Sequence, residues 1–157
     1  MTTYAQPTGS IANALDRLRN QIGQVPERLN VLPETDLTQH APGKWSRKEI
    51  LGHLIDSALN NLKRFTDAPL SDGPYVLQGY RQDDLVQANR YQQLPLAHLL
   101  TLWSSLNAQI VYVTEALPID ALSKPIRFSQ PDVPDRTLSW LIEDYLAHLE
   151  HHLKTLL

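Results

Sequence analysis

The chain contains no cysteine, so it can form no disulfide and offers neither a thiolate metal ligand nor a cysteine nucleophile. It also lacks a basic run, and its formal net charge of −3 argues against nucleic acid as a partner. No apolar stretch is long enough to cross a bilayer, and the opening MTTYAQPTGS lacks the charged and apolar regions of a secretory signal. These absences predict a soluble, cytoplasmic protein that binds neither membranes nor nucleic acid.

Motifs of common enzyme classes are missing as well. There is no GxGxxG or P-loop, and no serine lies in a nucleophile elbow. Signals for β-strands are almost absent. The eleven prolines lie between or at the ends of periodic segments. Because proline breaks helix interiors, the proline-free windows are where long helices can form.

Four such windows carry apolar residues at helical spacing. The expected helices run from a Ser10 N-cap to Val25, from Trp45-Ser46 to Phe65 or Thr66, from Leu96 to Leu117, and from Thr137 to Leu157. Ser46 and Glu49 fit a capping box at the start of the second helix. A short helix is expected over Leu85 to Tyr91. The pattern predicts an all-α protein, a four-helix bundle in a single domain over residues 1–157.

The connection from Asp67 to Leu94 is long for a compact domain. Its length allows the second and third helices to run parallel, joined by a crossover instead of a tight hairpin. The apolar stripes predict a core that includes Leu54, Trp103, Ile110, Leu141 and Tyr145.

The last helix carries a histidine cluster. His148 and His152 are one helical turn apart, so both imidazoles can reach one atom. On a helical wheel His152 falls inside the apolar stripe and His148 on its edge, whereas His151 turns toward solvent. His53 of the second helix is the best candidate for a third ligand. Three neutral imidazoles can hold a divalent metal and leave positions open for water or substrate. The alternative is a histidine-rich helix end without a metal, and His151 remains a possible contributor.

A polar stripe beside the core face of the second helix contains His53, Ser57, Asn60 and Arg64. Such a stripe can line a cleft, and Arg64 could bind a substrate carboxylate or equally pair with a surface acid. The alternative is a solvated helix flank. Asp56, Asp144 and Glu150 are possible acceptors for the N–H groups of ligand histidines, although an ordinary solvated carboxylate is the favoured interpretation for each. The three tryptophans are expected in the core or at helix entries.

The block Lys44-Trp45-Ser46-x-x-Glu49-x-x-x-His53-Leu54-x-Asp56-Ser57 resembles the signature of DinB/YfiT-like proteins. Asn60, Arg64-Phe65, Tyr80, Asp83-Asp84 and the run from His148 to Leu153 are similar in kind and order. The resemblance extends over about the whole chain and is nearest the YfiT-type, bacillithiol-transferase-like branch. It implies a four-helix bundle with a long crossover, often dimeric. It also implies a metal, nickel or zinc, held by His53, His148 and His152.

The resemblance further implies a metal-dependent hydrolase or a thiol S-transferase that uses a low-molecular-weight thiol. In either enzyme the bound metal would activate water or the thiol, and Asn60 and Arg64 would orient a small-molecule substrate. The partner expected is a second copy of the chain, as a homodimer. The alternative from a different class is a non-catalytic metal-binding or stress-associated helical-bundle module.

Overall fold

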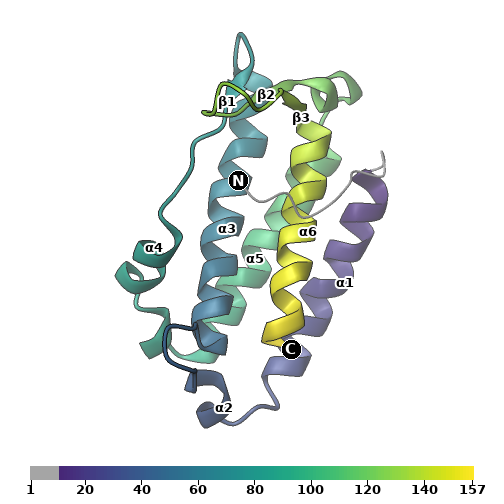
Figure 1. The fold of residues 1–157 in the computed structure, drawn as a ribbon. Coiled ribbons are helices and arrows are strands. Elements are labelled where there is room, and N and C mark those ends of the chain that lie inside the picture. The colour runs from purple at the N-terminus through teal and green to yellow at the C-terminus, as the bar shows by residue number, and fades with distance from the viewer. Residues whose placement is uncertain (1–10) are drawn as a thin grey trace.

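The computed structural model describes residues 11–157. Four long helices form the bundle in Figure 1: α1 (Ile11–Leu29), α3 (Arg47–Asp67), α5 (Leu96–Glu115) and α6 (Leu138–Leu156). α3 packs against both α5 and α6, and α1 packs against the same two helices. The predicted all-α four-helix bundle is therefore confirmed. The five residues predicted from the apolar stripes to be in the core, from Leu54 to Tyr145, are all buried.

The crossover between the second and third long helices is also confirmed. Figure 1 shows the chain leaving the upper end of α3, running back down the side of the bundle and entering α5 at its lower end. α3 and α5 consequently run in the same direction. The crossover contains the 3-10 turn η1 (Ala68–Leu70), the helix α4 (Gln82–Ala88) and the turn η2 (Tyr91–Gln93). The short helix thus begins earlier than predicted.

Local sequence signals account for the start of α3. The Ser46 side chain accepts a hydrogen bond from the backbone N–H of Glu49, and the Glu49 carboxylate accepts one from the backbone N–H of Ser46. This is the predicted capping box, which satisfies two backbone donors that a helix leaves free in its first turn. It fixes where the helix begins, with the N-cap Ser46 seven residues before His53. The N-cap predicted at Ser10 lies outside the described residues.

The prediction that Pro26 ends the first helix is wrong. α1 continues through Pro26 to Leu29. A proline in a helix interior removes one hydrogen bond and strains the preceding turn. Here Val25 and Leu29, on either side of it, are both fully buried. Burying two large aliphatic side chains stabilises the last turn by more than about 3 kcal/mol, which offsets that cost. The chain then turns through α2 (Glu34–Thr38).

A small sheet, which the sequence did not indicate, ties the two long connections together. β1 (Tyr75–Val76) pairs in parallel with β2 (Pro125–Arg127), and β2 pairs antiparallel with β3 (Arg136–Thr137). The turn η3 (Ile119–Ser123) precedes β2. The sheet lies at the upper end of the bundle in Figure 1, above α3 and α6. It holds residues 77–80 and 128–130 over that end, where they line a pocket. Within residues 11–157, no helix has the length and apolar character needed to span a bilayer.

Candidate metal centre

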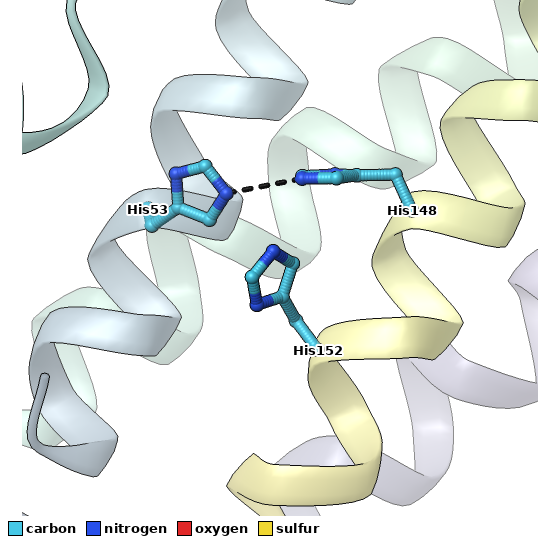
Figure 2. Close-up of side chains that lie close together, drawn as sticks. All are labelled: His53, His148 and His152. Atoms are coloured by element: carbon cyan, nitrogen blue, oxygen red, sulfur yellow. Dashed lines mark hydrogen bonds between the residues drawn. The ribbon is translucent and has the colours of Figure 1, made fainter. Parts of the chain in front are cut away.

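Three histidines meet between α3 and α6. Figure 2 shows the rings of His53, His148 and His152 pointing toward one another from the two helices. Each offers one nitrogen, and these three atoms all lie within 4.8 Å of one another. His53 Nε2 and His148 Nε2 are 3.1 Å apart, at hydrogen-bond distance. The structure thus brings together the three residues that the sequence singled out.

The closest pair in this donor set has the spacing of two ligands on a single divalent ion. Metal–nitrogen bonds to histidine are about 2.0–2.1 Å, so two nitrogens on one ion at tetrahedral or right angles lie about 2.9–3.4 Å apart. The 3.1 Å between His53 and His148 falls within that range. If these three imidazoles held an ion, it would keep at least one coordination position for water or substrate.

The electrostatics of the cluster keep its imidazoles neutral. Burial and, to a smaller extent, the charge of a protonated His152 together lower the pKa of His53 to about 4. Burial, followed by the neighbouring histidines, lowers the pKa of His148 to about 3. The pKa of His152 is also lowered, mainly by burial. All three rings therefore keep a free lone pair at neutral pH, which ligation requires.

The burial order of the pair on α6 differs from the helical-wheel prediction. His148, predicted on the edge of the stripe, is 9% exposed, whereas His152, predicted inside the stripe, is only half-buried. His148 faces α3 and the pocket, and His152 lies near the end of the bundle, where less chain covers it. His151 is exposed, as predicted, and its ring contacts that of His152 at a centroid distance of 5.3 Å.

Groups around the rings hold their orientation. The Ser57 hydroxyl lies 3.4 Å from His148 Nδ1, on the side opposite the cluster. The Trp45 ring lies against His53, with centroids 4.8 Å apart, and at 6.5 Å from His152. Trp45 is half-buried, so this helix-entry tryptophan also covers one side of the cluster.

Two buried polar atoms on the same stretch of α3 have no hydrogen-bond partner among the described residues. They are His53 Nδ1 and Asp56 Oδ2. Asp56 Oδ1 accepts hydrogen bonds from the Tyr91 hydroxyl at 2.6 Å and from the Asn89 amide at 2.9 Å. Burial nevertheless raises the pKa of Asp56 above its usual range. Of the other acids considered, Glu150 pairs with Arg17 at 3.4 Å and Asp144 lines the pocket.

A polar pocket of about 470 Å³ opens beside the cluster. His148 belongs to its wall, so the histidine cluster adjoins this space. The remaining lining comes from α3, from α6 and from the two connections joined by the small sheet: Ser57, Asn61, Arg64, Leu77, Gln78, Gly79, Tyr80, Gln82, Phe128, Ser129, Gln130, Leu141, Asp144 and Tyr145. Such a volume suits a small-molecule ligand.

The predicted substrate residues divide between two sides of α3. Arg64 lines the pocket, whereas Asn60 is not among its lining residues and donates its amide to the backbone carbonyl of Asp56 at 2.8 Å. Asn61 occupies the pocket side instead. On a helical wheel Asn60 lies toward Asp56, and Asn61 lies about 40° beyond Ser57. The sequence could not tell which edge of the polar stripe faces α6.

Comparison with known proteins agrees with this architecture. The model of the DinB superfamily matches residues 14–156, so the chain belongs to this superfamily. A relative from Halalkalibacterium halodurans is 28% identical over 138 residues, covering 85% of this chain and 78% of its own. One from Bacillus cereus is 26% identical over 155 residues, covering 96% and 86%. Both carry the name "Putative metal-dependent hydrolase".

Solved structures share the fold at lower sequence identity. YfiT from Bacillus subtilis, described as "a probable metal-dependent hydrolase with an unusual four-helix bundle topology", superposes with a TM-score of 0.80. It is 17% identical, and the match covers 98% of this chain and 87% of YfiT. A mycothiol-dependent maleylpyruvate isomerase matches with a TM-score of 0.70 and 15% identity, over 98% of this chain and 62% of its own. The chain therefore has the fold of YfiT.

Proposed function

We propose that this protein is a metal-dependent enzyme in which His53, His148 and His152 hold one divalent ion, nickel or zinc. The reaction is attack on a small-molecule substrate by water, as in a hydrolase, or by a low-molecular-weight thiol, as in an S-transferase. One observation carries the proposal: three neutral imidazoles converge within 4.8 Å at the wall of a polar pocket. A purely structural histidine cluster would not need a cavity beside it.

When bound, a divalent ion lowers the pKa of a coordinated water or thiol and supplies a nucleophile near neutral pH. The chain's own residues provide orientation. Ser57 fixes the ring of His148 from the pocket side, and Trp45 covers His53 on another side. Arg64 and Asn61 present polar groups to a substrate in the pocket. Because Asn61 lines the pocket, it takes the orienting role first assigned to Asn60.

Different relatives support the two nucleophiles. The relatives that are 26–28% identical carry the name of metal-dependent hydrolases, which favours water. The isomerase that shares the fold is mycothiol-dependent, which favours testing thiols. With no cysteine in the chain, any thiol must come from a cosubstrate. The two reactions need the same metal site and differ in what occupies the open position.

The first test is metal content. Protein purified without a metal-affinity tag should contain about one divalent ion per chain by elemental analysis. His53→Ala, His148→Ala and His152→Ala should each lose it, because each removes one of three ligands. His151→Ala is the matched control and should keep the ion. Retention of metal by the three ligand variants, or its loss in His151→Ala, would contradict the ligand assignment.

The second test is turnover of the metal-loaded protein. Hydrolysis of small esters and amides should be measured beside consumption of a low-molecular-weight thiol in the presence of an electrophile. Activity lost in His148→Ala and kept in His151→Ala supports the enzyme. A fully loaded protein with neither activity would make it a metal-binding module without turnover.

A further inference from the structure

Arg64 is a charged side chain whose hydrogen-bonding capacity is largely unused. It is 7% exposed and lines the pocket. A guanidinium carries five N–H donors. Nη1 donates to Asn61 Oδ1 at 3.3 Å, and Nη2 donates to the backbone carbonyl of Gln78. Three donors therefore have no partner among the described residues.

The positive charge of Arg64 is also uncompensated. Within residues 11–157, no carboxylate lies at salt-bridge distance from Arg64. Asp144 also lines the pocket. Burial lowers the pKa of Arg64, the direction expected when a charge loses water without gaining an anion. The Tyr80 ring covers one face of the guanidinium, at 5.6 Å from the centroid.

A row of polar side chains on α3 connects this cation to the histidine cluster. Ser57 Oγ contacts His148 Nδ1 at 3.4 Å, and the Asn61 amide contacts Ser57 Oγ at 3.4 Å. Asn61 in turn accepts from Arg64. Ser57 and Arg64 are seven residues apart, about 10 Å along the helix, and the guanidinium reaches back toward Asn61. The cation is thus roughly 6–10 Å from the histidine end of the pocket.

We infer that the pocket takes a substrate bearing a carboxylate, which binds Arg64 while the reacting atom of the same molecule lies beside His148. The planar guanidinium matches a carboxylate with two parallel N–H···O bonds, a geometry that a lysine cannot supply. This inference rests on the proposed function and adds the charge and the length of its substrate. The carboxylate can belong to the thiol or to the molecule that the nucleophile attacks.

The test uses mercaptocarboxylates as probes on cobalt-loaded protein, where thiolate coordination produces a charge-transfer absorption band. Mercaptohexanoate should bind at least about tenfold tighter than mercaptohexanol, which has the same sulfur and chain but no charge. Mercaptopropionate, too short to reach from the histidines to Arg64, should lose most of that advantage. Equal binding of mercaptohexanoate and mercaptohexanol would overturn the inference.

Two variants assign the preference to Arg64. Arg64→Gln should abolish the advantage of mercaptohexanoate and leave mercaptohexanol binding unchanged. Lys63→Gln is the matched control, since it removes the same charge from the adjacent, exposed position of α3, and it should keep the advantage. An equal loss of both probes in Arg64→Gln would make Arg64 a structural residue and refute the inference.

A second measurement separates this inference from the proposed function. In metal-free wild-type protein, hexanoate should shift the Nε–H resonance of Arg64, and hexanol should not. If hexanoate shifts this resonance but no thiol produces a charge-transfer band on the cobalt-loaded protein, the anion site stands and the proposed thiol chemistry is refuted. Absence of the shift would refute the anion site. If hexanoate still binds when mercaptoethanol is saturating, the carboxylate belongs to the molecule that the nucleophile attacks. If hexanoate and mercaptoethanol exclude one another, the carboxylate belongs to the thiol.

Discussion

Gly52 gives the most direct test of how the crossover packs on the helix that carries His53. In α3 a Cβ at this position would lie 2.1, 2.2 and 2.6 Å from Cδ2, Cγ and Cβ of Tyr91. Tyr91 is buried against the helix, and its hydroxyl donates to Asp56 Oδ1 at 2.6 Å. Gly52→Ala should therefore push the tyrosine off α3.

The expected magnitude combines three effects. Alanine in a helix interior is about 1 kcal/mol more favourable than glycine. Overpacking costs about 1–3 kcal/mol, and losing a buried hydrogen bond to a charged group costs about 1.5–3 kcal/mol. The net effect of Gly52→Ala is a loss of about 1.5–5 kcal/mol in the free energy of unfolding. The sign is opposite to that expected from helix propensity alone.

Urea denaturation followed by circular dichroism measures this loss. Gly23→Ala is the matched control, because Gly23 lies inside α1 and its Cβ would meet nothing within 4 Å. That variant should gain about 0.4–1 kcal/mol. In a Tyr91→Gly background, Gly52→Ala should also be neutral or stabilising, since the whole obstructing side chain, including its Cβ, is gone. If Gly52→Ala stabilised the wild-type protein as Gly23→Ala does, the inference that Tyr91 packs directly on Gly52 of α3 would be refuted.

Three further predictions concern the site and the assembly. First, the metal-free protein should lose stability as pH falls from about 6.5 toward about 4, because the unfolded chain then binds protons that folded His53, with its pKa lowered to about 4, does not. Over this pH range the loss in the free energy of unfolding is about 3 kcal/mol for one histidine. Urea unfolding should show a shallower pH dependence for His53→Gln than for the wild-type protein. Equal stability of the wild-type protein at pH 6.5 and pH 4 would contradict the prediction. Second, nickel or cobalt should quench tryptophan fluorescence through Trp45, whose ring lies 4.8 Å from that of His53, and Trp45→Phe should remove most of the quenching. Third, the chain should sediment as a homodimer at micromolar concentration, and a monomer throughout would refute that expectation.

Much of the fold could be predicted because its signals are local. The capping box of Ser46 and Glu49 depends on residues three positions apart, and it forms as predicted. The same holds for the apolar periodicity that buries Trp103, Ile110 and Leu141. Pro26 shows the limit of local reasoning, because the burial of Val25 and Leu29 against other helices overrides its breaking tendency. The small sheet was missed because its strands are too short to show an alternating pattern.

Some features of the candidate site also follow from local sequence, whereas others depend on tertiary packing. The single-turn spacing of His148 and His152 is a property of any helix, so the sequence determined that these two rings could act together. His53 was the best candidate for the third ligand, and the resemblance of the block around it supported that choice. Which edge of the polar stripe on α3 faces the pocket depends on where α6 and the crossover lie, and this decided between Asn60 and Asn61.

The sequence by itself thus determined the helices, their apolar faces and the histidine pair, since each follows from interactions within about one helical turn. The tertiary structure alone decided the burial of His148 over His152, the contact of Tyr91 with Gly52, and the unpaired charge of Arg64. Each of these depends on segments far apart in the chain. Helical periodicity says which residues share a face, and only the packing of helices says what that face meets.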